Sequence, residues 1–300
     1  MTKTILVSGA SGFIGSHVAE RLVEQGYRVR AMTRRPQEYR GAGEPVEADV
    51  MRAESLGPAF DGVDAAYYLV HSLGSDDFES RDAEAARAFA AAAATARLER
   101  IVYLGGLGSD SGRLSAHLRS RRAVEKILRA GPVPVTVLRA AVVVGHGNIS
   151  WEMTRELSDR LPVMVTPRWV NTRTQPIALA DAVRYLTGVL EPAEARGRTY
   201  EIGGPEVLRY IDMLQRAAMI RGKRVRNVTV PLLTPRLSSA WLRLVTDVDT
   251  VTARNLIDSM TNEVVVRDDA ITRLVPGAAI GYDEAVRLAL EQRERAGADR

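Results

Sequence analysis

The chain of 300 residues has no cysteine and no run of 18 or more apolar residues. The absence of cysteine excludes disulfide bonds, thiolate metal sites and cysteine nucleophiles. Without a long apolar run, the sequence offers no candidate for a membrane-spanning helix. Its first residues also lack the apolar stretch and the small-residue cleavage site of a signal peptide, so we expect a cytoplasmic protein.

Lysine is nearly absent too. Of the 41 basic residues, only Lys3, Lys126 and Lys223 are lysines, so that 38 are arginines. A mechanism that needs a catalytic lysine therefore has three candidates. The net charge of +4 is spread along the chain without a basic block, so we expect no nucleic-acid partner and expect the arginines to be mostly solvated.

The N-terminal segment has the pattern of a strand, a glycine-rich turn, a helix and a second strand. An apolar run over 4–7 leads into the turn SGASGFIG at 8–15. From Phe13 the apolar residues recur at helical spacing, and Gly26 is typical of a helix end. Residues 27–32 then predict the second strand. A dinucleotide-binding turn requires this setting.

Each glycine of this turn has a physical role in such a site. Gly9 permits the tight turn, Gly12 lets the backbone approach a pyrophosphate, and Gly15 lets the helix pack closely on the strand. The free N–H groups at the start of the helix attract phosphates. The alternative is a glycine-rich turn that binds nothing. The predicted cofactor contacts in this segment are Gly9, Ser11, Gly12, Phe13, Ile14 and Gly15.

The end of the second strand predicts which dinucleotide binds. The sequence there is Thr33-Arg34-Arg35-Pro36, without the acidic residue that binds the ribose 2′-hydroxyl of NAD. Arg34 and Arg35 can instead hold the 2′-phosphate of NADP by charge-assisted hydrogen bonds. We therefore expect NADP(H). The alternative is two surface arginines at the start of a loop.

Strand patterns continue to alternate with helical ones, which predicts an α/β fold with a doubly wound, parallel Rossmann-type sheet. We expect residues 1–147 to form the NADP-binding domain, and 177–204 to return to it. Residues 148–176 and 205–300 would form a smaller, mostly helical lobe on the substrate side. The further predicted strands of the sheet are 46–48, 63–70, 101–104, 133–144 and 199–202.

Several segments resemble one protein family. The GxxGxxG spacing at Gly9, together with ERIVYLGGLGS, HLRSRRAVEKIL, LRAAVVVG and YEIGGPEVLRY, is similar to the atypical and extended branches of the short-chain dehydrogenase/reductase superfamily. Within them the chain resembles the NmrA-like or YbjT-like NAD(P)-binding proteins. The resemblance covers nearly the whole chain and implies the fold and the cofactor more firmly than the reaction.

The resemblance implies four more cofactor contacts. Asp49 and Val50 match an Asp-Val pair that flanks the adenine, although Asp49 could also be the N-cap of a helix over 53–60. Val70 and His71 end a strand near the place that the superfamily gives to the diphosphate and the nicotinamide ribose.

The superfamily's catalytic set is missing from this sequence. It consists of a Ser or Thr after the fifth strand, followed by Tyr and Lys at YxxxK spacing. None of the nine tyrosines has a lysine four residues later. The matching positions hold His117 in place of Tyr, Arg121 in place of Lys and Leu107 in place of the hydroxyl residue. Ser109 could supply a hydroxyl only if its loop bends inward.

The pair His117 and Arg121 supports two interpretations. Their spacing places them on one helix face. In the first interpretation, Arg121 binds the nicotinamide ribose and His117 donates or accepts a proton, tending to be neutral beside the guanidinium. In the second, His117 closes the cofactor pocket without proton chemistry. Arg121 contacts the ribose in both.

The remaining candidates are weaker. His146 follows the sixth strand as a loop residue or a substrate contact, and four scattered histidines predict no metal site. We expect Glu125 and Lys126 on the helix surface. The aromatic residues expected mostly in the core, or lining a pocket, are Trp151, Trp169 and Tyr210.

The leading hypothesis is an NADP(H)-dependent oxidoreductase that transfers a hydride to or from a small carbonyl, imine or enone substrate. One alternative is a non-catalytic NADP-binding sensor or assembly protein, which the missing catalytic residues favour. A nucleotide-sugar epimerase or dehydratase shares the fold but normally needs the Tyr/Lys pair. The sequence leaves the substrate, the direction of reaction and the oligomeric state open.

Overall fold

The computed structural model describes residues 2–72, 74–108, 114–160, 163–166, 168–224, 226–229 and 250–298. At its centre is a seven-stranded parallel sheet with the strand order β11-β6-β5-β4-β1-β2-β3. The prediction of a doubly wound Rossmann-type sheet is therefore confirmed. Its strands are β1 (Thr4–Ser8), β2 (Arg28–Thr33), β3 (Glu44–Glu47), β4 (Ala65–Tyr68), β5 (Arg100–Gly106), β6 (Val135–Ala140) and β11 (Thr199–Ile202).

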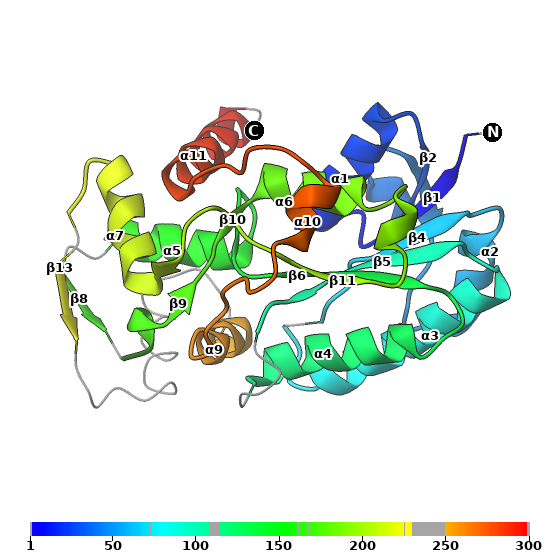
Figure 1. Cartoon of the computed structure of the whole chain (residues 1–300), viewed down its shortest axis with the longest axis horizontal. Coiled ribbons are helices and arrows are strands. Elements are labelled where there is room, and N and C mark those ends of the chain that lie inside the picture. The colour runs from blue at the N-terminus through cyan, green and yellow to red at the C-terminus, as the bar shows by residue number, and fades with distance from the viewer. Residues whose placement is uncertain are drawn as a thin grey trace.

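Helices cover both faces of this sheet (Figure 1). One face packs against α1 (Phe13–Glu24), α6 (Leu179–Gly188) and α10 (Ala270–Leu274). The other packs against α2 (Leu56–Phe60), α3 (Phe78–Thr95) and α4 (Ala116–Arg129). Short 3₁₀ turns lie at η1 (Pro36–Glu38), η2 (Ala53–Ser55), η3 (Arg168–Asn171) and η4 (Ala193–Ala195).

Strand β4 explains how one sheet supports two cores. Its sequence is AAYY, and all four residues are buried. Because successive side chains of a strand point to opposite faces, Tyr67 enters the core under α1 and α6 while Tyr68 enters the core under α3. A continuous apolar run is what a parallel strand covered on both faces requires.

The sixth predicted strand, 133–144, is wrong in its extent. Strand β6 ends at Ala140, and a separate strand, β7 (Val143–Val144), pairs with β10 (Ile177–Ala178) in a two-stranded sheet of its own. Residues 141 and 142 carry the chain out of the main sheet although their side chains are apolar. Hydrophobicity alone therefore does not reveal the break.

The chain beyond β7 builds a third core. Trp151, Tyr210, Ile257 and Tyr282 are buried there together. Its helices are α5 (Ile149–Arg160), α7 (Tyr210–Ile220), α9 (Thr250–Ser259) and α11 (Tyr282–Ala298). Short strand pairs accompany them, namely β9 (Arg173–Thr174) with β12 (Leu208–Arg209), and β8 (Val163–Thr166) with β13 (Arg226–Thr229). Among the helices that the structure describes, none is long and apolar enough to cross a membrane.

Helix α4 carries the two residues that replace Tyr and Lys, and its start is fixed by Ser115. The Ser115 hydroxyl accepts a hydrogen bond from the Leu118 N–H at 3.3 Å, which is a helix N-cap. The helix therefore begins at Ala116. The first turns of α4 place His117 and Arg121 beside the carboxyl ends of β5 and β6.

Candidate active site

The glycine-rich turn between β1 and α1 is as tight as the sequence indicates. Gly9 has a φ of +71°, a conformation that favours glycine. A Cβ added to Gly15 would lie 2.1 Å from the Gly9 carbonyl oxygen. Helix α1 starts at this turn without a side-chain cap and without an acidic residue in its first turn. Its first N–H groups are thus available to an anion.

A first cavity of about 710 Å³ opens beside this turn, at the carboxyl ends of β1, β2 and β4. Predicted cofactor residues line this cavity and a second, smaller one, which is described below. Gly15, Phe13 and Arg35 do not line it, and Ile14 lines the second cavity instead. The predicted cofactor residues that line it are Gly9, Ser11, Gly12, Arg34, Asp49, Val50, Val70 and His71.

The two arginines after β2 differ in their surroundings. Arg34 lines the first cavity, and no carboxylate pairs with it in the part of the chain that is described. Arg35 points elsewhere and pairs with Glu38 at 3.1 Å. A third cation, Arg81 on α3, lines the same cavity. Arg81 could not be singled out from sequence patterns, because it comes from a helix outside the glycine motif.

Asp49 lines the first cavity and is not a helix N-cap. Its Oδ1 accepts a hydrogen bond from the Met51 N–H at 3.0 Å, which closes a local turn. The helical segments that follow are preceded by Arg52 and Ser55 at their cap positions. The N-cap alternative for Asp49 is therefore wrong.

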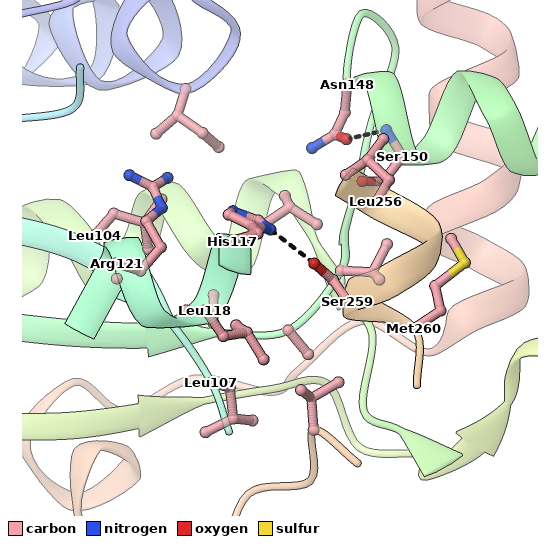
Figure 2. Close-up of a pocket in the computed structure, with 18 of the residues that line it drawn as sticks. Leu104, Leu107, His117, Leu118, Arg121, Asn148, Ser150, Leu256, Ser259 and Met260 are labelled. Carbon is pink, nitrogen blue, oxygen red and sulfur yellow. Dashed lines mark hydrogen bonds between the residues drawn. The ribbon is translucent and has the colours of Figure 1, made fainter. Parts of the chain in front are cut away.

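The second cavity measures about 200 Å³ and lies beyond the carboxyl ends of β5 and β6 (Figure 2). His117 and Arg121 line it one helical turn apart on α4. Leu107, at the position of the missing hydroxyl, also lines it and is 1% exposed. Ser109 lies outside the described residues.

A buried carboxylate–histidine pair lies where the two cavities meet. The Asp82 Oδ2 atom is 2.7 Å from His71 Nδ1 and accepts a hydrogen bond from the Ser120 hydroxyl at 2.9 Å. Its Oδ1 atom accepts from the Ser72 N–H at 2.9 Å. His71, which lines the first cavity, stacks on His117, which lines the second, with ring centroids 5.0 Å apart.

The pKa shifts of this cluster follow from burial and charge. Burial lowers the pKa of His71, the Arg121 charge adds to this, and the Asp82 carboxylate opposes it. Burial lowers the pKa of His117 well below its usual value, and His71 and Arg121 lower it further. Burial disfavours ionised Asp82, but its hydrogen bonds from His71 and Ser120 bring its pKa below the usual value. Both imidazoles are therefore neutral at pH 7.

This arrangement predicts a stability that falls on mild acidification. In the unfolded chain both imidazoles titrate near pH 6.5, and in the folded chain they protonate only at lower pH. The contribution of the neutral histidines to the free energy of unfolding is thus complete above pH 6.5. As the pH falls below 6.5, the free energy of unfolding decreases by at most about 1.4 kcal/mol per pH unit for each histidine. Urea unfolding from about pH 7 to 5 measures the slope. The variant His117→Asn should have a shallower slope, and an unchanged slope would contradict the burial argument.

Family membership follows from a match over more than half of the chain. Residues 9–164, which include the glycine turn and all of α4, match the family described as NAD(P)H-binding. The chain belongs to this NAD(P)H-binding family. With it the chain belongs to the NmrA-like, YbjT-like group of atypical short-chain dehydrogenases/reductases, as the sequence motifs indicate.

The NAD(P)H-binding protein has a curated relative in Streptomyces griseus subsp. griseus. This is a (4-alkanoyl-5-oxo-2,5-dihydrofuran-3-yl)methyl phosphate reductase, 30% identical over 234 residues. The alignment covers 74% of this chain and 75% of the relative.

Two solved structures share the fold. A triphenylmethane reductase from a Citrobacter species has a TM-score of 0.78 at 20% identity, over 96% of this chain and 99% of its own. An NADPH-dependent quinone oxidoreductase from Escherichia coli, solved with NADPH, has a TM-score of 0.76 at 20% identity, over 94% and 98%. At these identities the likeness concerns the fold alone.

In the NAD(P)H-binding protein, Glu125 is not on the helix surface, where it was expected, and Arg100 is an exception among arginines expected to be mostly solvated. Glu125, expected on the surface of α4, is 6% exposed and binds Arg122 at 3.0 Å and Arg139 at 2.8 Å. It faces the sheet, because Arg139 on β6 requires a buried partner there. Arg100 is buried too and donates to main-chain carbonyls. Lys126 is exposed, as expected.

The other candidate residues lie away from the centre of the site. His146 binds Glu152 at 3.0 Å and lines neither cavity, which favours its loop role. Trp151 is buried in the third core, and Tyr210 is buried but also lines the second cavity. The Trp169 side chain lies outside the described residues. Within the described ranges, no three His, Asp or Glu side chains are grouped as metal ligands.

Proposed function

We propose that the protein is an NADP(H)-dependent oxidoreductase that reduces a small organic molecule in the second cavity. One observation carries the proposal. A small, mostly apolar cavity has its polar end at His117 and Arg121, and the His71–His117 stack joins that end to the cavity beside the glycine turn. A hydride-transfer site needs this adjacency of cofactor and substrate.

The first cavity fits the phosphate-bearing half of the cofactor. The turn at Gly9 and Gly12 and the uncapped start of α1 would hold the pyrophosphate. Arg34 would hold the 2′-phosphate, Asp49 would flank the adenine, and Arg121 would bind the nicotinamide ribose. Bound NADPH would supply a hydride to the substrate.

The lining of the second cavity limits what can bind there. Among the described lining residues Arg121 is the one charged group, and none of them is a carboxylate. The apolar lining favours a flat, hydrophobic molecule, whereas the guanidinium favours a neutral or negatively charged one. The relative from Streptomyces griseus subsp. griseus is itself a reductase, which supports the same class of reaction.

Oxidation of NADPH across a panel of aldehydes, ketones, imines, enones and quinones tests the proposal. We expect turnover with at least one class and tight binding of NADPH without a substrate. If NADPH bound tightly but no class of acceptor were reduced, the proposed reductase function would be refuted. The alternative of a non-catalytic NADP-binding sensor or assembly protein would then be favoured.

Replacement of Arg34 by alanine tests the choice of cofactor. Loss of a charge-assisted hydrogen bond to a phosphate should weaken NADPH binding about 10-fold and leave NADH binding nearly unchanged. Fluorescence titration of both cofactors measures this. Arg35→Ala is the matched control, because its side chain pairs with Glu38 outside the cavity. An equal loss for both cofactors in Arg34→Ala would contradict the assignment.

A further inference from the structure

The hydrogen bonds around Ser259 determine which nitrogen of His117 carries the proton. The Ser259 hydroxyl donates its single proton to the Asn255 carbonyl at 2.8 Å. His117 Nδ1 lies 3.1 Å from the same hydroxyl oxygen, and with the hydroxyl proton directed at the Asn255 carbonyl the imidazole supplies the proton of that bond. Ser115 agrees with this pattern. Its oxygen accepts from the Leu118 N–H, and its own proton is free to point at Ser259, 3.3 Å away.

In this arrangement of hydrogen bonds the proton of His117 is assigned to Nδ1, and Nε2 carries a lone pair. Ser259 comes from α9 and His117 from α4, so two elements far apart in the sequence fix the ring together (Figure 2). The ring is neutral at pH 7 because burial, His71 and Arg121 all disfavour the imidazolium. In this state His117 accepts a hydrogen bond and has no proton to give from Nε2.

The other polar groups of the second cavity are also poor proton sources. An arginine guanidinium donates hydrogen bonds but does not act as an acid in proteins. Burial raises the pKa of Tyr210 to about 12, so its phenol keeps its proton at neutral pH. Asn148 and Ser150 carry an amide and an aliphatic hydroxyl, which are not acids at neutral pH. The described lining thus offers a fixed positive charge without a ready acid.

We propose that Ser259 is a positioning residue that holds His117 as an acceptor, and that the site consequently reduces conjugated acceptors, namely enones and quinones, in preference to isolated ketones. The inference rests on the proposed function and narrows its substrate class. Reduction of an isolated ketone leaves an alkoxide, a strong base that needs a proton as it forms. Reduction of an enone or a quinone leaves an enolate or a phenolate, a far weaker base.

When an enone is reduced, the two electrons of the incoming hydride are accommodated by shifts of electron pairs within the substrate. The hydride brings two electrons and bonds to the β-carbon, the alkene π pair moves between the α-carbon and the carbonyl carbon, and the carbonyl π pair moves onto oxygen. The Arg121 guanidinium stabilises the negative oxygen electrostatically. Solvent water protonates the α-carbon after release. The substrate is reduced and the nicotinamide oxidised by two electrons.

The first arm of the test reads the tautomer directly, without any turnover. Nitrogen-15 NMR of the full chain with labelled histidine should show His117 protonated at Nδ1, with the signal assigned by its loss in His117→Asn. In Ser259→Ala the population with a proton on Nε2 should rise. Thr261→Ala, an exposed position at the same end of the helix, should leave the tautomer unchanged. Protonation at Nε2 in the wild type would overturn the proposal.

The second arm compares cyclohexenone and a benzoquinone with cyclohexanone as acceptors of electrons from NADPH. We expect kcat/KM for an enone or quinone to exceed that for the ketone at least about 100-fold, because a general acid, which the described lining lacks, is worth that much. In Ser259→Ala the ratio should fall, which a merely structural loss would not cause. Comparable rates in the wild type would overturn the preference. Failure of all acceptors would instead refute the proposed function, and the tautomer would still decide the role of Ser259.

Discussion

Replacement of Gly15 by alanine should abolish measurable NADPH binding and destabilise the fold by about 3 kcal/mol, the upper end of the usual cost of overpacking. The added methyl group would lie 2.1 Å from the Gly9 carbonyl oxygen, and both partners are backbone that cannot move aside. The start of α1 would have to shift away from β1, and its N–H groups would leave the pyrophosphate site. Urea unfolding and fluorescence titration with NADPH measure the two effects.

Gly57→Ala is the matched control for this substitution. Gly57 lies in α2, and nothing lies within 4 Å of a Cβ added there. Because Pro58 follows and disfavours a helical residue with a Cβ before it, alanine should change the free energy of unfolding by less than about 1 kcal/mol and leave NADPH binding unchanged. If Gly15→Ala bound NADPH as the wild type does, the close packing at this turn would have no part in holding the cofactor.

Replacement of Arg121 by methionine should lower kcat/KM about 100-fold or more. Methionine keeps much of the side-chain length but removes the charge that we assign to the ribose and to the negative oxygen of the product. Loss of one such electrostatic contact typically costs about 10²–10³-fold. The pKa of both His71 and His117 should also rise, because the Arg121 charge lowers them. Steady-state kinetics and a histidine NMR titration measure the two effects.

Arg121→Lys is the informative comparison, because it restores the lysine of the superfamily without its tyrosine. The charge remains, so we expect a loss of at most about 10-fold relative to wild type. If methionine and lysine reduced the rate equally, the planar guanidinium, and not its charge, would be what the reaction needs. If neither reduced it, Arg121 would have no part in binding or chemistry.

The sheet could be predicted from the sequence because its signals are local. The run before Gly9, the glycine spacing and the helical spacing after Phe13 all lie within one strand–turn–helix unit. The break after Ala140 could not be predicted, because it depends on β7 pairing with β10, which comes more than thirty residues later. Local patterns carry no information about such a partner.

The candidate site was predictable only in part, for the same reason. His117 and Arg121 follow from one helix, but Asp82 and Ser259 meet them only through the fold. A signal for Asp82 did exist. It is a carboxylate at helical spacing within the apolar stripe of α3, and a buried charge in such a place needs a partner. No comparable signal exists for Ser259, a serine near the end of a distant helix.

The edge strands of the central sheet bear on whether two copies of this protein can associate by pairing strands. Strand β3 is one edge, and its sequence, Glu-Pro-Val-Glu, places two charges and a residue without an N–H where a foreign strand would pair. Strand β11 is the other edge, and α10 packs beside it. The β3 edge thus resists the addition of a strand. At this edge the central sheet ends within one chain instead of continuing into a strand of a second copy.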